Sequence, residues 1–234
     1  MTTRIVVLYQ SLLGIYGDRG NGMVLRTRLA WRGLDATLTM VEPGEPVPAD
    51  ADIYLLGGGE DLAQVTAVDK LKRDGNLFRA LDRGAVLFAV CAGYQLCGTT
   101  FTVGINDEVT QGLGLLDVET RRAEPRAVGE ILTRWTRPDG QESFITGFEN
   151  HGGRTSLGPG ARPLARVVHG VGNGDGTEGA VQGKVVGTYP HGPVLARNPD
   201  LADWLLSLAL GHDLDPLPSP EIDILRSQRL AAVS

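Results

Sequence analysis

The sequence predicts an α/β fold with a mostly parallel central sheet flanked by helices and some antiparallel strands in the second half. Two observations lead to this expectation. In the first half, short apolar runs alternate with helix-like segments, which is typical of a parallel sheet covered by helices. In the second half, strand-like runs follow one another with glycine-rich turns and few helices between them. Some of those strands should therefore pair in antiparallel fashion.

The expected strands of the first half are three apolar runs at residues 5–9, 53–56 and 85–90. Each run is short, fully apolar and bounded by glycine or charged residues. Runs of this kind are typical of strands that are buried on both faces of a sheet. The segments at 21–31 and 76–82 are expected to form helices between them.

The second half holds five further strand-like runs, at 115–120, 127–135, 143–146, 165–168 and 185–189. Residues 201–210 are expected to form a closing helix, because Asn198-Pro199 is a good helix start and Gly211 a good stop. From Asp213 onward the chain holds four acidic residues and three prolines. We therefore expect a domain at 1–212 and a tail at 213–234 that is extended and then forms a short helix.

Composition excludes several classes of protein. The 234 residues are 42% hydrophobic, which is enough for one domain with a real core. The net charge is −6 and no basic run exceeds Arg121-Arg122, so a nucleic-acid surface is not expected. No apolar stretch approaches the ~20 residues of a membrane span, and the first residues do not resemble a signal peptide. A cytoplasmic location is therefore expected.

The strongest chemical signal is the segment Ala89-Val90-Cys91-Ala92-Gly93. It directly follows an apolar strand, and small residues surround the cysteine, as a sharp strand-to-helix turn requires. At such a turn the thiol stands at a helix N-terminus, which favours the reactive thiolate. Cys91 is thus predicted to be a nucleophile. Cys97 lies inside the expected helix and is predicted to be a core thiol.

A cysteine nucleophile needs a base, and the chain has four histidines. His191 follows the last strand-like run of the sheet, where α/β active sites form, so it is the predicted base. His151 lies in a segment predicted to be a loop, and its role stays open between substrate pocket, interface and structural turn. His169 and His212 are expected to be solvated or to cap a helix.

Three glycines, 57–59, follow the strand-like run at 53–56. They allow backbone N–H groups to approach a ligand closely. The loop matches neither a P-loop nor a dinucleotide motif, so beside a cysteine nucleophile it is better interpreted as half of an oxyanion hole.

These features, in this order, resemble the class I glutamine amidotransferases, which have a flavodoxin-like fold. The branch that includes cobyric acid synthase fits best, because Gly192 and Pro193 follow the histidine where the standard branch has Pro and Glu. Three longer segments resemble the GatD family, the glutaminase subunits of lipid II isoglutaminyl synthase. They are 15–21 (IYGDRGN), 147–155 (GFENHGGRT) and 192–199 (GPVLARNP).

The resemblance implies a division of labour in peptidoglycan synthesis. The glutaminase releases ammonia from glutamine. A Mur-ligase-like synthetase subunit of the MurT type, joined in a heterodimer, then amidates the D-glutamate of the lipid II stem peptide to D-isoglutamine. ATP and magnesium are expected on that partner, with no cofactor or metal in this chain. The segments 15–21 and 149–154 are expected to contact the partner or form the ammonia exit, without serving thioester chemistry.

The resemblance also implies roles for single residues. Cys91 matches the nucleophile and His191 the base, whereas Gly58 and Ala92 match the backbone donors of the oxyanion hole. Arg126 best fits the arginine that binds the substrate carboxylate, with Arg121 and Arg122 as alternatives, and Gln95 resembles a substrate contact. An acid that orients His191 is not identified; Glu149 and a residue of the partner are both open.

Two other functions stay open at this point. One is an amidotransferase for cobyrinic acid or another carboxylate, although those enzymes normally carry their synthetase domain on the same chain. The other is a DJ-1-like redox or chaperone protein, which also has a cysteine at a sharp turn on a flavodoxin-like sheet. The late Tyr189-Pro190-His191 segment and the long second half favour the amidotransferase.

Overall fold

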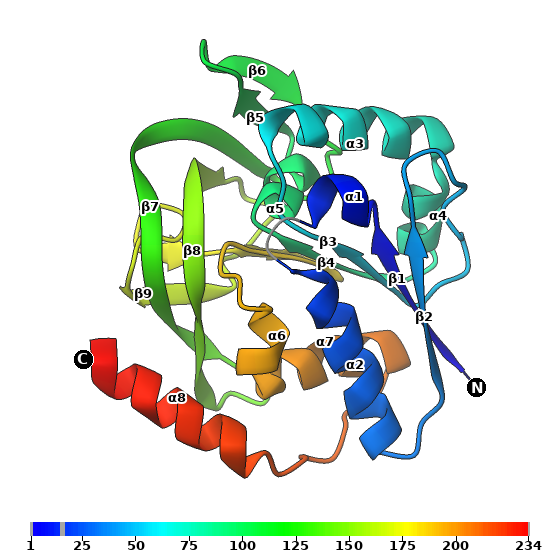
Figure 1. Ribbon diagram of the computed structural model, residues 1–234, viewed down its shortest axis with the longest axis vertical. Coiled ribbons are helices and arrows are strands. Elements are labelled where there is room, and N and C mark those ends of the chain that lie inside the picture. Colours follow the sequence, from blue (N-terminus) through cyan, green and yellow to red (C-terminus); the bar gives the residue numbers. More distant parts are fainter. Residues whose placement is uncertain (1, 15–16, 234) are drawn as a thin grey trace.

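The computed structural model describes residues 2–14 and 17–233. Its central sheet has six strands in the order β11-β12-β4-β3-β1-β2 (Figure 1). All neighbours are parallel except β11, which runs antiparallel to β12. The strands are β1 (Thr3–Leu8), β2 (Ala36–Val41), β3 (Ile53–Leu56), β4 (Val86–Val90), β11 (Ala180–Gln182) and β12 (Val185–Thr188). The predicted strands of the first half are confirmed.

Helices cover both faces of this sheet, as expected. Because side chains alternate along a strand, Leu8 and Leu56 pack into one core while Ile5 and Ile53 pack into the other. One side is covered by α1 (Gln10–Leu13), α3 (Asp61–Asp74), α4 (Asn76–Asp82) and α5 (Ala92–Cys97) (Figure 1). The other side is covered by α2 (Arg19–Trp31), α6 (Val194–Arg197) and α7 (Pro199–Leu210).

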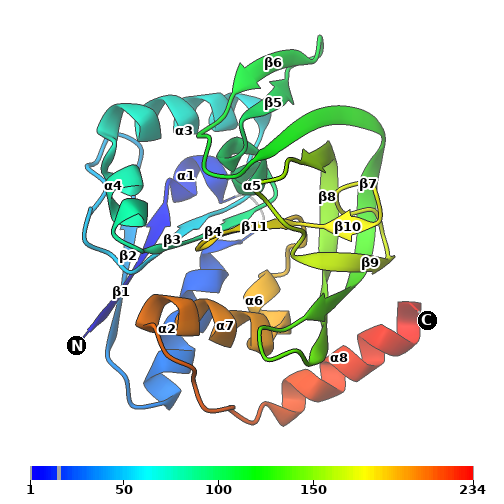
Figure 2. The same cartoon turned by 180° about the vertical axis from the view of Figure 1, so that it is seen from behind.

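A second sheet packs beside the first and is mostly antiparallel (Figure 2). Its order is β10-β9-β7-β5-β6, with β8 paired to β7. The strands are β5 (Thr100–Val103), β6 (Glu108–Gln111), β7 (Val118–Thr136), β8 (Glu142–Leu157), β9 (Ala165–His169) and β10 (Thr177–Glu178). The expected antiparallel pairing in the second half is confirmed.

The segment 149–154, predicted to be a loop, lies instead in the middle of β8. Gly153 permits close packing rather than a turn. A Cβ atom on Gly153 would lie only 2.5 Å from the Gln95 amide nitrogen and 2.8 Å from the Tyr189 hydroxyl oxygen. A side chain at this position would collide with both residues, so glycine allows β8 to pack against α5 and the segment after β12.

The tail after residue 212 is extended and then forms α8 (Pro220–Val233). This helix lies under the second sheet and α6 (Figure 1). Arg226 donates to the Phe144 carbonyl at 2.7 Å, and Arg229 pairs with Glu130 at 3.7 Å. The division into a domain at 1–212 and a tail stays a prediction. Among the described residues, no helix has the length and hydrophobicity needed to cross a lipid bilayer.

Candidate active site

Three neighbouring parallel strands bring the candidate residues together. β12, β4 and β3 are adjacent in the sheet, so their carboxyl ends meet at one edge. Ligand sites of open α/β sheets form at such edges. The chain leaving β12 carries His191, the chain leaving β4 carries Cys91, and the chain leaving β3 forms the loop 57–59.

Cys91 occupies the sharp turn that the sequence predicts. Its backbone has φ 54° and ψ −108°, which is a strained conformation for a residue with a side chain. The Cys91 N–H donates to the Thr188 carbonyl at 2.8 Å, and α5 begins at the next residue. The side chain is only 6% exposed and lies at the wall of a cavity. The strand, the turn and the helix thus hold the thiol at one defined place.

His191 lies against the Cys91 thiol and is 4% exposed. Its Nδ1 is 3.2 Å from each carboxylate oxygen of Asp18. Burial alone would lower the pKa of His191, but the contacts with Asp18 and Cys91 outweigh this effect and raise the pKa to about 9. His191 is therefore protonated at neutral pH and can act as an acid toward a leaving group beside Cys91.

Asp18 is the acidic partner of His191 that sequence reasoning missed. It is 4% exposed, precedes α2, and also accepts a hydrogen bond from the Gly58 N–H at 2.8 Å. The expectation that segment 15–21 has no part in the chemistry is therefore wrong for Asp18, because its carboxylate directly contacts the imidazole. Ile15 and Tyr16 lie outside the described residues. Glu149, the acid suggested by the sequence, contacts His151 instead.

The glycine loop differs from its expected geometry. The Gly58 N–H donates to Asp18, so in this structure it does not face the cavity as an oxyanion donor. Gly59 lines the cavity instead. Glycine is needed in this loop because it packs on α1: a Cβ on Gly57 would lie 2.1 Å from the Leu13 carbonyl oxygen. Ala92 begins α5 and lines the cavity, and its N–H belongs to the first-turn donors that a helix leaves without an intrahelical acceptor.

The cavity beside Cys91 has a volume of about 330 Å³ and a polar, charged lining. Two arginines, Arg122 and Arg126, face it together with three acids. Such a mixture suits a small zwitterion, because opposite charges of the ligand find partners on different walls. The remaining lining residues are Gly59, Glu60, Asp61, Gln64, Ala92, Gln95, Thr102, Thr120, Glu124, Asn150, His151, Gly152 and Gly153.

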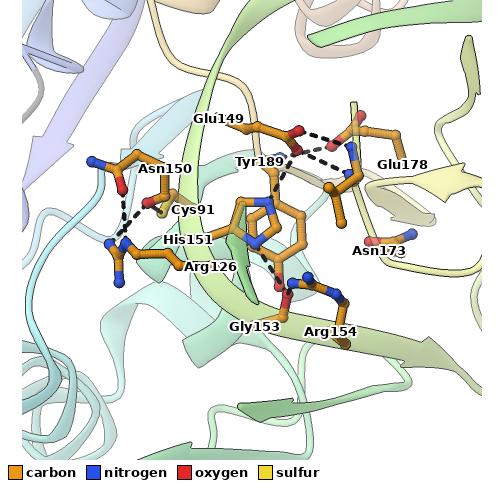
Figure 3. Close-up of polar contacts among 12 residues, drawn as sticks. Cys91, Arg126, Glu149, Asn150, His151, Gly153, Arg154, Asn173, Glu178 and Tyr189 are labelled. Atoms are coloured by element: carbon orange, nitrogen blue, oxygen red, sulfur yellow. Dashed lines mark hydrogen bonds and ion pairs between the residues drawn. The ribbon is translucent and has the colours of Figure 1, made fainter. Parts of the chain in front are cut away.

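The three candidate arginines have different surroundings. Arg126 donates from Nε to the Asn150 side-chain oxygen at 2.8 Å and from its terminal nitrogen to the Asn150 carbonyl at 3.2 Å (Figure 3). Arg122 is paired with Asp61 at 2.7 Å and Asp107 at 3.2 Å. Arg121 does not line the cavity and pairs with Glu119. Arg126 therefore remains the best candidate, and Arg122 is the alternative that the geometry allows.

The other predicted residues have simpler positions. Gln95 lines the cavity, and its amide nitrogen lies 3.4 Å from the Tyr189 hydroxyl. Cys97 is fully buried in the core, and burial raises the pKa of its thiol. His169 and His212 are exposed, in keeping with solvated side chains.

The profile of one family covers most of the sequence: the CobB/CobQ-like glutamine amidotransferase domain matches residues 4–199. The chain belongs to this family. The amidotransferase is 34% identical to the lipid II isoglutaminyl synthase (glutamine-hydrolyzing) subunit GatD of Staphylococcus aureus, over 90% of this chain and 86% of that protein. It is 37% identical to cobyric acid synthase of Sphingopyxis alaskensis, over 73% of this chain but only 34% of that longer protein.

Solved structures agree with this amidotransferase in fold. A crystal structure of a glutamine amidotransferase superimposes with a TM-score of 0.60 at 23% identity, over 88% of this chain and 98% of that one. The glutaminase domain of Trypanosoma brucei CTPS with bound acivicin has a TM-score of 0.55 at 12% identity, over 94% of this chain and 98% of that one. These structures confirm the expected flavodoxin-like amidotransferase fold. The expected glutaminase activity is confirmed by the family match and by the relatives named GatD.

Proposed function

We propose that this amidotransferase hydrolyses glutamine through a thioester on Cys91. We further propose that it supplies the ammonia to a Mur-ligase-like synthetase subunit, which amidates the D-glutamate of the lipid II stem peptide. The observation that carries the chemistry is the contact series Cys91–His191–Asp18 beside a charged cavity. The acceptor is suggested by the relatives named GatD, which this chain matches over nearly its whole length.

The hydrolysis then takes two acyl-transfer steps, first from glutamine to Cys91 and then from Cys91 to water. The Cys91 thiolate attacks the δ-carbon of glutamine, and the oxyanion that forms lies beside the Ala92 N–H. As the C–N bond breaks, His191 gives its proton to the departing nitrogen and ammonia leaves. The neutral imidazole next takes a proton from water, which attacks the thioester and releases glutamate, so the Cys91 thiolate is restored. Asp18 holds the imidazole in place through Nδ1 and stabilises its charged form.

Replacing Arg126 by alanine should raise the KM for glutamine more than it lowers kcat. The reason is that an arginine on the α-carboxylate holds the ground state and the transition state equally. Steady-state glutaminase assays measure both constants. Arg121→Ala is the matched control, because that arginine lies outside the cavity. An unchanged KM in Arg126→Ala would assign the carboxylate to Arg122.

We assign the activation of the acceptor carboxylate to the partner subunit. Activation of a carboxylate needs ATP and magnesium, which we assign to the synthetase subunit, and the complex would lie in the cytoplasm. Ammonia released into water at neutral pH would be protonated and lost as a nucleophile. The glutaminase should therefore act in contact with its synthetase, as a heterodimer.

The isolated chain should hydrolyse glutamine slowly and amidate nothing. With a Mur-ligase-like partner, ATP, magnesium and lipid II, it should yield an amidated stem peptide and elute with the partner as a heterodimer. Size-exclusion chromatography and mass spectrometry of the muropeptides measure the two results. If the partner amidated lipid II equally well with glutamine in the absence of this chain, the proposed role would be wrong. Glutamine hydrolysis without lipid II amidation would instead favour another carboxylate acceptor, such as a cobyrinic-acid-type substrate.

A further inference from the structure

A buried pair of titratable residues, Glu149 and His151, lies under the cavity and has no part in the thioester steps. Each is only 2% exposed. The His151 Nε2 lies 3.2 Å from a Glu149 carboxylate oxygen, and its Nδ1 lies 3.0 Å from the Gly153 carbonyl oxygen (Figure 3). Burial lowers the pKa of His151, although Glu149 opposes this effect. The ring is thus a buried, uncharged group at the wall of the cavity at neutral pH.

Glu149 also ties a separate loop to β8. Its two oxygens accept hydrogen bonds from the Val171 N–H at 2.8 Å and the Gly172 N–H at 3.0 Å. Burial alone would raise the pKa of Glu149, but His151 and these two N–H groups outweigh it and lower the pKa. The ionised carboxylate therefore joins β8 to the loop at Val171 and Gly172 by charge-assisted hydrogen bonds.

Asn150 stands between the two members of the pair and faces the other way. Because side chains alternate along a strand, Glu149 and His151 point into the protein while Asn150 points toward Cys91 and Arg126 (Figure 3). The Asn150 carbonyl oxygen lies 4.0 Å from the Cys91 sulfur, and both oxygens of Asn150 accept from Arg126. Fixing Glu149 and His151 therefore also fixes Asn150 and Arg126, which form one wall of the substrate site.

The pair also contacts the segment that carries His191. The His151 ring stacks on Tyr189, with ring centres 3.7 Å apart and an angle of 13° between the planes. Tyr189 precedes His191 by two residues, and its hydroxyl contacts Thr155 at 2.7 Å and Gln95 at 3.4 Å. A displaced His151 would therefore disturb both the floor of the cavity and the segment that carries the base.

We propose that Glu149 and His151 form a positioning pair that sets Asn150 and Arg126 on one side of Cys91 and Tyr189 on the other. This inference rests on the proposed glutaminase function, because the position that it fixes is that of glutamine relative to the thiol. A buttress of this kind is expected to matter, since a misplacement of about 1 Å in an active site can reduce the rate on the order of 10²-fold.

The test compares two reagents that react with Cys91. A glutamine-derived chloroketone needs the substrate site, whereas iodoacetamide needs only the thiol. Glu149→Gln keeps the size of the side chain, and His151→Phe keeps a flat ring that can stack on Tyr189. Both variants should react with the chloroketone roughly 10- to 100-fold more slowly than the wild type, with an unchanged rate toward iodoacetamide. In glutaminase assays, His151→Phe should raise KM more than it lowers kcat. His151→Ala also loses the stack on Tyr189, so its kcat should be lower than that of His151→Phe.

Asp203→Asn is the matched control for lost stability. It weakens a partly buried ion pair with Arg28 and Arg32 between α2 and α7, remote from the cavity. Its melting temperature should fall while its ratio of chloroketone to iodoacetamide rates stays that of the wild type. The positioning role would be overturned if the ratio of the chloroketone rate to the iodoacetamide rate were unchanged in both Glu149→Gln and His151→Phe. This holds whether the two rates keep their wild-type values or fall by the same factor. If the chloroketone failed to label even wild-type Cys91 while iodoacetamide labelled it, the proposed function itself would be at fault.

Discussion

Replacing Cys91 by alanine or serine should abolish glutamine hydrolysis, whereas Cys97→Ala should retain most of the activity. Cys91 stands at a strained turn, at the start of α5 and in contact with His191, so its thiolate is the group that can form the thioester. Cys97 is fully buried, and the raised pKa of its thiol keeps it protonated. The rate of glutamate release from glutamine measures the effect.

Covalent labelling gives an independent check on this assignment. A glutamine-derived chloroketone should modify Cys91, and peptide mapping by mass spectrometry identifies the modified residue. Cys97→Ala should be labelled like the wild type, and Cys91→Ser should not be labelled. Labelling at Cys97 alone would refute the assignment of the nucleophile.

Replacing His191 by alanine should lower kcat/KM by roughly 10²–10⁴-fold, the contribution typical of general acid–base catalysis. His191 contacts Cys91, and its raised pKa keeps it protonated at neutral pH, so it is placed to protonate the departing nitrogen. His169→Ala and His212→Ala are controls, because both side chains are exposed. If His151→Ala were the inactive variant and His191→Ala retained its rate, the assignment of the base would be wrong.

The loss of the His191 proton should set the alkaline limit of activity. The pKa of His191 is raised to about 9 in part by Asp18, and the acid function is lost as the pH rises through that value. kcat/KM should therefore fall above a pH of about 9. Asp18→Asn removes one of the raising contacts, so the fall should begin at a lower pH. A pH profile with an unchanged alkaline limit in Asp18→Asn would show that Asp18 does not act through the imidazole.

The parallel sheet could be predicted because its strands are buried on both faces and have a simple apolar pattern. β2 was not predicted, since its residues alternate between partly buried and exposed positions at the edge of the sheet. α3 was also missed, because its buried face is narrow and uses Gln64 and Ala67 beside Val68 and Leu71. The long pair β7–β8 was predicted only in parts, because the glycines of segment 149–154 imitate a loop.

Cys91 and His191 could be found because local sequence carries their signals: small residues around a cysteine after a strand, and a histidine after another strand. Asp18 carries no such signal. It lies 173 positions from His191 in the sequence, and only the adjacent packing of α2 and the end of β12 brings the two side chains together. Segment 15–21 was singled out for its resemblance to a family, yet the burial of Asp18 against His191 is a property of the folded chain.

The most direct measurement of the central claim is to trap the covalent intermediate. The protein is mixed with glutamine, quenched in acid within the first turnovers, digested and examined by mass spectrometry. The account predicts a glutamyl group on the peptide that contains Cys91, absent from Cys91→Ser and absent when glutamate replaces glutamine. Continued glutamine hydrolysis by Cys91→Ser, or a glutamyl group found only on the peptide that contains Cys97, would contradict it.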